Sequence, residues 1–277
     1  MAESRYRRLC ADWHVPEQYT LHRTQAADYF PPDDFEALTS ALTAFGQQEL
    51  GCRSISPPWL SFYTDGCEQR LHADVPQGPF AYVLSLTRWD ERRFTGGETC
   101  IMQPQITDYW RDFDSSRGLE YSDLMCTVAP EFNRLTVFDA RLPHGVGRVH
   151  GEMDPRGSRL VLHGWFTEPE PFFEGGLDEA AVESGLQAVL RKTYDAIGAP
   201  SVTGLLSVRM DVNTTGRIDG VERLADVLVA DPAQLPPGVQ PTEARERVVG
   251  TIMRELGEAS FEPCKEPSRI ILPFIFD

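Results

Sequence analysis

The spacing of apolar residues along the chain changes twice and so separates three stretches. In the first, apolar side chains recur three and four positions apart: Phe35, Leu38, Leu42 and Phe45. This period predicts an amphipathic helix within residues 31–50, and the Pro-Pro-Asp-Asp run at its start is a helix-starting signal. Gly51 is well placed to end that helix, because glycine adopts left-handed backbone at little cost.

The second stretch, from about residue 59 to 167, consists of short β-like runs separated by glycine and proline. The clearest runs are residues 59–63, 80–86, 135–138 and 160–166. Many short strands between turn residues are typical of a sandwich, barrel or jelly roll. Residues 108–122 are polar and aromatic, which predicts a long excursion near the mouth of that fold.

The third stretch follows a proline- and glycine-containing boundary at residues 167–175. Its pattern predicts a helix, a strand pair, a second helix and a final apolar strand, at residues 178–195, 204–212 with 217–229, 242–256 and 269–276. About 100 residues of this kind make a normal α+β domain. We therefore predict two domains, 1–176 and 177–277, with the last strand pairing with residues 204–212.

Composition narrows the classes of partner. A net charge of −16 repels phosphate backbones, so nucleic acid is not expected as a partner. No apolar run approaches the roughly 20 residues that span a bilayer, and no apolar segment follows the charged start. We expect no membrane association and a cytoplasmic location. The six scattered cysteines form no CxxC pair, which favours reduced thiols over disulfides or a zinc site.

Candidate metal chemistry begins at His72-Ala73-Asp74, which lies between two strand-like runs. In a strand, residues i and i+2 project from the same face, so both side chains can reach one ion. His144, which follows the apolar run 135–138, is the best third ligand. Two imidazoles and one carboxylate would leave coordination positions open, as in non-haem iron(II) oxygenases. His14, His22 and His150 lie in polar surroundings and are expected at the surface.

Four segments resemble, in order and approximate spacing, the prolyl-4-hydroxylase-like 2-oxoglutarate oxygenases: residues 69–74 (QRLHAD), 96–99 (GGET), 133–138 (NRLTVF) with His144, and 159–165 (RLVLHGW). The resemblance covers roughly residues 20–167. It implies a mainly β double-stranded β-helix, or jelly roll, with flanking helices. It also implies iron(II), 2-oxoglutarate as co-substrate, dioxygen (O2), and ascorbate as a reductant.

The resemblance assigns the far carboxylate of 2-oxoglutarate to Arg159, since a buried guanidinium suits a bidentate pair. Arg148 and Arg156 compete for this role, but their loop is expected to face water. Many members of the family add a tyrosine on the strand after HxD. Ser85 takes that place here, so the candidates for co-substrate binding are Tyr63 and Tyr82. His163, four residues after Arg159, is a weaker candidate.

The implied activity is hydroxylation of an unactivated C–H bond, in a prolyl or other peptidyl or amino-acid substrate, with release of succinate and CO2. Related halogenases lack the metal-binding carboxylate, so Asp74 favours hydroxylation. One alternative is a catalytically inactive metal-binding jelly roll that serves as a sensor or interaction module. Another is a cupin-like isomerase with a different metal, which would not need Arg159.

The third stretch has a fainter resemblance to TonB-like C-terminal domains, carried by residues 208–212, 216–218, 261–264 and 272–274. Such domains are small α+β modules used for protein contact. A scaffold or lid packed on the oxygenase domain is an equal alternative. No cluster of ligating or nucleophilic residues occurs in this stretch.

Overall fold

The computed structural model describes residues 12–15, 19–75, 77–104, 106, 116 and 118–276. Its contacts divide the chain into two compact units, one holding residues up to 40 and 55–167, the other 41–54 and 168 onward. The division differs from the predicted boundary at 176/177, because residues 41–54 and 168–176 belong with the second unit. Most of the predicted excursion at 108–122 lies outside the described residues.

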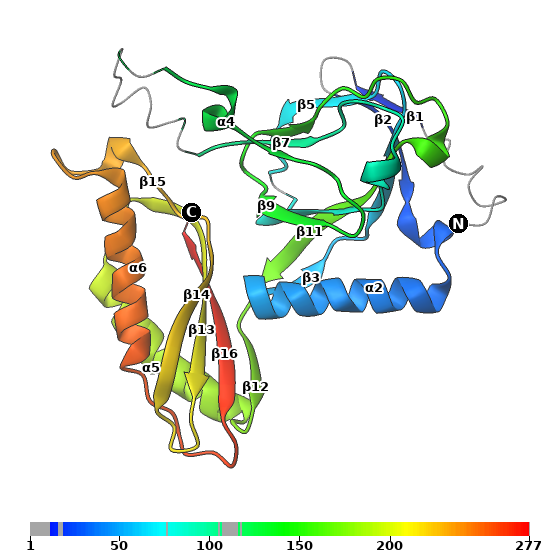
Figure 1. The fold of residues 1–277 in the computed structure, drawn as a ribbon. Helices are drawn as coiled ribbons and strands as arrows, with labels where there is room; N and C mark the ends of the chain where they lie inside the picture. Colours follow the sequence, from blue (N-terminus) through cyan, green and yellow to red (C-terminus); the bar gives the residue numbers. More distant parts are fainter. Residues whose placement is uncertain are drawn as a thin grey trace. The chain divides into compact units, whose positions relative to one another are not determined.

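An antiparallel sheet of eleven strands dominates the chain and makes it mainly β (Figure 1). Its path runs β8-β7-β10-β5-β2-β4-β11-β6-β9, while β1 pairs with β2 and β3 with β11. The strands are β1 (Asp12–Val15), β2 (Tyr19–Gln25), β3 (Cys52–Ile55), β4 (Trp59–Tyr63), β5 (Glu68–His72), β6 (Phe80–Ser85), β7 (Thr99–Met102), β8 (Met125–Val128), β9 (Leu135–Asp139), β10 (His144–Val146) and β11 (Arg159–Pro169).

The predicted first helix is α2 (Pro32–Phe45), which continues as a wider turn over Gly46–Leu50. Two aspartates in its first turn suit the positive end of the helix dipole. Gly51 ends it with a φ of 67°, as the sequence predicted. Short helical segments also occur at Ala26–Tyr29, Trp89–Glu91, Tyr121–Leu124 (α4) and Pro155–Gly157.

Strand register sorts the central strands into an apolar and a polar face. Leu60, Phe62 and Leu162 pack with Ala26 and Tyr29 into one apolar cluster. The alternate residues share the other face, since side chains in a strand alternate. That face carries Arg23 opposite Ser61, Tyr63 opposite Arg159, and Trp59 opposite His163. Polar side chains thus converge on one face of β2, β4 and β11, and this face holds the candidate site.

The second unit contains a five-stranded antiparallel sheet and two long helices, α5 (Glu179–Ile197) and α6 (Pro241–Gly257) (Figure 1). Its strands are β12 (Phe172–Gly175), β13 (Val202–Val212), β14 (Ile218–Asp226), β15 (Val229–Ala230) and β16 (Ser268–Phe276). β16 pairs with β13 along its whole length, which confirms the predicted pairing of the last strand. The stretch predicted to be a boundary, residues 167–175, contains β12, which pairs with β16.

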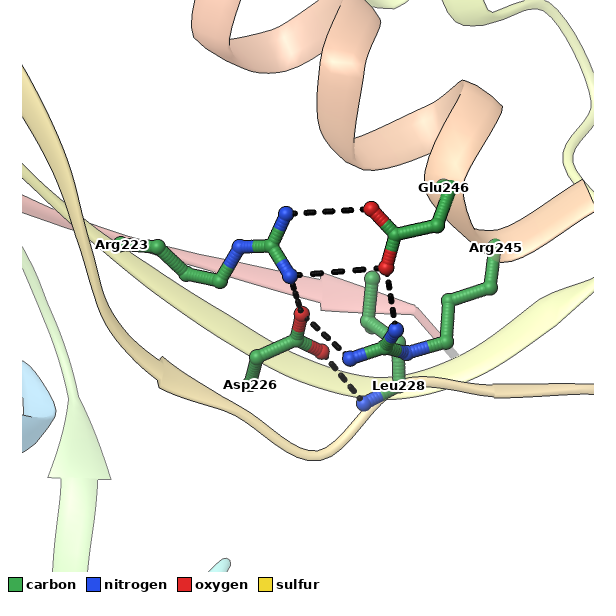
Figure 2. Close-up of polar contacts among 5 residues, drawn as sticks. All are labelled: Arg223, Asp226, Leu228, Arg245 and Glu246. Carbon is green, nitrogen blue, oxygen red and sulfur yellow. Dashed lines mark hydrogen bonds and ion pairs between the residues drawn. The ribbon is translucent and has the colours of Figure 1, made fainter. Parts of the chain in front are cut away.

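Asp226 links β14 to α6 through a network of charged groups (Figure 2). One carboxylate oxygen accepts from Arg223 at 3.1 Å and from Arg245 at 2.7 Å, and the other accepts from the backbone N–H of Leu228 at 3.2 Å. Glu246 pairs with both arginines. The side chain of Asp226 is 7% exposed, so solvent screens this network only weakly.

We expect Asp226→Asn to lower the free energy of unfolding by about 2 kcal/mol, because an amide NH2 would then face two guanidinium groups. Urea unfolding followed by circular dichroism measures the change. The matched control is Glu243→Gln, which removes an exposed i,i+4 pair with Arg247 and should cost less than about 0.5 kcal/mol. Equal losses for the two variants would contradict the structural role of Asp226.

Candidate metal centre and its cavity

Three donor side chains meet where β5 and β10 pair. His72 ends β5, His144 begins β10, and the two residues face each other in register. Asp74 follows two residues later, and its backbone N–H donates to Ala140 at 2.9 Å. One ligand atom from each residue lies within 4.8 Å of the others. The structure therefore brings together the three residues that the sequence singled out.

Backbone carbonyls set the orientation of both imidazoles. The Nδ1 of His72 lies 2.8 Å from the Arg70 carbonyl oxygen, and the Nδ1 of His144 lies 2.9 Å from that of Leu142. A carbonyl only accepts, so each Nδ1 carries the proton and each Nε2 keeps its lone pair. These Nε2 atoms lie 3.5 and 3.2 Å from the carboxylate oxygens of Asp74. The donor set fits a first-row divalent ion with coordination positions left open.

The electrostatics of the cluster keep Asp74 ionised. Burial is the largest single effect and raises the pKa of its carboxyl, but the neighbouring His144 and His72 side chains together outweigh it and hold the pKa well below its usual range. Burial is the largest single effect and lowers the pKa of His72, but Asp74, the Arg70 backbone and the His144 backbone together raise it by more. Asp74 thus supplies a carboxylate at neutral pH, the form that binds metal.

Trp165, on β11, donates from its indole Nε1 to Asp74 Oδ2 at 3.0 Å. A partner of this kind fixes the orientation of a metal-binding carboxylate. We expect Trp165→Phe to weaken binding of Mn(II) or Zn(II) by about 10-fold or more, measured by calorimetry. The matched control, Trp89→Phe, alters an indole that lies under Arg92 and meets Phe94 edge to face, and it should leave metal affinity unchanged. Equal affinities for Trp165→Phe and the unmodified chain would exclude this orienting role.

A cavity of about 400 Å³ lies against the metal cluster and contains Arg159. Arg159 is 1% exposed, and burial lowers the pKa of its guanidinium. Its Nη2 donates to Thr99 Oγ1 at 3.1 Å, and its Cζ lies 4.5 Å from the centre of the Tyr63 ring. Its Nε and Nη1 have no hydrogen-bond partner among the described residues. A buried cation with two free donors is a site for an anion.

The GGET segment surrounds Arg159. Gly97 has a φ of +84°, and a Cβ there would lie 3.3 Å from Arg159 Cδ and 3.1 Å from Phe94. Glycine is therefore needed at this position, because the backbone has a positive φ and because a side chain would crowd Arg159 and Phe94. Thr99, at the start of β7, provides the hydroxyl that Arg159 contacts.

The two arginines that competed with Arg159 for the co-substrate carboxylate lie elsewhere. Arg148 and Arg156 are exposed, as the sequence predicted, and Arg156 pairs with Asp154.

The two candidate tyrosines lie in different environments. Tyr63 packs under Arg159, and its hydroxyl donates to Gln69 at 3.2 Å; burial raises its pKa. Tyr82 contributes to the cavity wall but pairs with Gly164, so its side chain leaves the sheet on the face opposite to that of Arg159. There its ring packs on Phe166. Of the two, Tyr63 has the geometry suited to an anion held by Arg159.

Ser85 lies on the face of β6 that corresponds to that of Arg159, since it pairs with Val161. Its side chain is buried but does not line the cavity, and its hydroxyl donates to the Pro130 carbonyl at 2.5 Å.

His163 does line the cavity, where its Nε2 lies 2.8 Å from Ser61 Oγ. Burial, followed by the charges of Arg23 and Arg159, lowers its pKa to about 3. His163 is therefore a neutral hydrogen-bonding group.

Besides Thr99 and Trp165, two further polar residues of the site were not predicted from the sequence. Gln69 lies between Tyr63 and His72, with its Nε2 3.1 Å from His72 Nε2, and Arg23 projects from β2 into the cavity. The sequence did show an alternating pattern across residues 19–25 that indicates a strand. It could not show that this strand lies near Arg159, because that depends on which strands pair and in which register.

The other three histidines were expected at the surface. His150 is exposed as expected, whereas His22 is partly buried and stacks on Phe62 at 4.4 Å; the side chain of His14 lies outside the described residues.

No protein-family model and no curated protein matches this sequence. Among solved structures, a Pseudomonas putida prolyl-4-hydroxylase is similar at 19% identity and a TM-score of 0.39, over 60% of this chain and 83% of that one. A 2OG-Fe(II) oxygenase family oxidoreductase from Burkholderia pseudomallei has 18% identity and a TM-score of 0.35, over 53% and 64%.

A third similar structure is a Trichoplax adhaerens prolyl hydroxylase in complex with a hypoxia inducible factor peptide fragment. It has 16% identity and a TM-score of 0.38, over 56% of this chain and 66% of that one. At these identities and scores, the functional argument rests on the site itself.

Two further expectations concern the cysteines and the membrane. The five described cysteines are free, and no helix in the described part of the chain is long and apolar enough to cross a membrane.

Proposed function

We propose that this chain is an iron(II)- and 2-oxoglutarate-dependent dioxygenase that hydroxylates an unactivated C–H bond in a prolyl or other peptidyl or amino-acid substrate. One observation carries the proposal: a His-Asp-His donor set and a buried guanidinium with two free nitrogens line the same cavity. A dicarboxylate co-substrate that chelates a metal at one end needs a cation for its other end. Arg159 is suited to that role.

Each residue has a defined task under this proposal. His72, Asp74 and His144 would hold iron(II), which when bound supplies oxidative decarboxylation of 2-oxoglutarate coupled to O2 activation. Arg159, with Thr99 fixing its guanidinium and Tyr63 beneath it, would bind the distal carboxylate. The second unit, which holds none of these residues, is proposed to serve protein contact, in line with its TonB-like pattern.

The test is 2-oxoglutarate turnover by the full-length chain, loaded with iron(II) without oxygen and then exposed to air, with and without ascorbate. We expect succinate and CO2 in equal amounts, and mass spectrometry of amino acids and proline-containing peptides should find a mass gain of one oxygen atom. His144→Ala should form no succinate. Tight metal binding without any succinate would favour an inactive metal-binding module, and 2-oxoglutarate-independent chemistry would favour a cupin-like isomerase.

A further inference from the structure

The side-chain amide of Gln69 connects the metal cluster with the buried guanidinium. Gln69 lies on β5, close before His72 in the chain, and lines the same cavity. Its Oε1 accepts a hydrogen bond from the Tyr63 hydroxyl at 3.2 Å, and its Nε2 lies 3.1 Å from His72 Nε2. The Tyr63 ring in turn lies under Arg159, with its centre 4.5 Å from the guanidinium carbon. A chain of contacts thus runs from the cation to a metal ligand.

The two neighbours of the amide agree on its orientation. His72 donates from Nδ1 to the Arg70 carbonyl, so its Nε2 presents a lone pair toward Gln69. An amide oxygen would be repelled by that lone pair, whereas an amide N–H can donate to it. The NH2 group of Gln69 therefore faces His72, and its oxygen faces Tyr63, whose hydroxyl donates to it.

The hydrogen bond from Gln69 uses the lone pair with which His72 would bind a metal. One lone pair cannot serve both an N–H group and an ion, so metal binding has to displace the amide from His72. Tyr63 would still hold the amide oxygen, which keeps the NH2 group beside the donor set. A ligand in an open coordination position can then accept from it. Under the proposed function, one such ligand is the carboxylate with which 2-oxoglutarate chelates the metal.

We propose that Gln69 exchanges its hydrogen bond to His72 for one to the metal-chelating carboxylate of 2-oxoglutarate, and so positions the co-substrate between the metal and Arg159. An amide suits this place because it adds a directed donor without adding a charge. Gln69 then acts with opposite sign on two binding steps: it opposes metal binding and favours co-substrate binding. This inference rests on the proposed function, since the same cavity would hold the metal and 2-oxoglutarate.

Calorimetry on the full-length chain tests both steps in Gln69→Met, which keeps the length of the side chain and removes the amide. We expect Mn(II) to bind about 2- to 10-fold more tightly, because no hydrogen bond to His72 has to be broken. We expect 2-oxoglutarate to bind the Mn(II)-loaded protein, in the absence of oxygen, about 10-fold more weakly or worse, because a hydrogen bond to a charged group is lost.

Gln69→Leu is the second variant, and it should shift the two affinities in the same opposite directions. The matched control is Gln187→Met, which removes an exposed amide on α5 that contacts Glu183 at 3.4 Å and should change neither affinity. Circular dichroism verifies that each variant is folded.

Either of two results would overturn the role of Gln69. One is an unchanged or weaker affinity for Mn(II) in the folded variants, which is what a residue that only supports His72 would give. The other is binding of 2-oxoglutarate as tight as in the unmodified protein. The proposed function fails on a different result, namely an unmodified chain that binds no Mn(II), or no 2-oxoglutarate once loaded with it, and the role of Gln69 then fails as well.

Discussion

Asp74→Ala should lower 2-oxoglutarate turnover by at least about 1,000-fold and metal affinity by at least about 100-fold, because it removes the anionic donor of the cluster. Two Nε2 atoms would remain, at 3.5 and 3.2 Å from the vacated carboxylate oxygens. Two neutral imidazoles hold a divalent ion far more weakly than two imidazoles and a carboxylate do. Metal content after dialysis and succinate formation are the two measurements.

The matched control is Asp154→Ala, which removes an exposed carboxylate paired with Arg156 in the same unit. Turnover and metal content should stay at the level of the unmodified chain. Asp74→Glu serves as a second variant, since it keeps the charge but displaces the carboxylate by one methylene group, and it should retain part of the metal binding. If Asp74→Ala kept full metal affinity, the assignment of Asp74 as a ligand would be wrong.

The metal cluster could be predicted because its geometry is largely local. His72 and Asp74 are two residues apart at the end of a strand, so any extended backbone brings them to one side. His144 needed only a strand that pairs with theirs, and β10 provides it through the His144–His72 register. The tautomers could not be predicted, since they depend on the carbonyls of Arg70 and Leu142.

The division into units was harder to predict because it depends on pairing over long sequence distances. Phe172 pairs with Ile271, about a hundred residues further on, so the short apolar run after Pro171 was predicted to be part of a domain boundary. The end of α2 and the wider turn after it belong to the second unit, where Ser207 Oγ donates to the carbonyl of Leu50 in that turn. A chain ending near residue 176 would therefore lose partners of residues 41–54 and of β12.

The lining of the cavity depends on register, which a sequence does not state. Tyr82 and Ser85 differ by an odd number of positions, so they lie on opposite faces of β6. Pairing of Val161 with Ser85 and of Gly164 with Tyr82 places Tyr82 on the face away from Arg159. Arg23 reaches the cavity for the same reason, through its pairing with Ser61. Whether Tyr82, Ser85 and Arg23 lie near Arg159 is therefore decided by strand pairing and register.

Arg159→Met should raise the Michaelis constant for 2-oxoglutarate by about 100-fold or more, since a carboxylate left without its buried partner costs several kcal/mol. Calorimetry of 2-oxoglutarate binding to the Mn(II)-loaded protein measures the same loss directly. The control is Arg148→Met, because Arg148 is exposed, and it should change neither value. An unchanged constant in Arg159→Met would assign the co-substrate carboxylate to another cation, with Arg23 the first to test.

The same substitution should leave the ligand-free protein as stable as before or more stable, by up to about 2 kcal/mol. Arg159 is buried with Nε and Nη1 unpartnered among the described residues, and a thioether of similar length removes that desolvation cost. A residue kept for packing would show the reverse: Arg159→Met would unfold at lower urea and bind 2-oxoglutarate normally once folded. Loss of binding together with unchanged or increased stability is the result expected of a cation retained for its ligand.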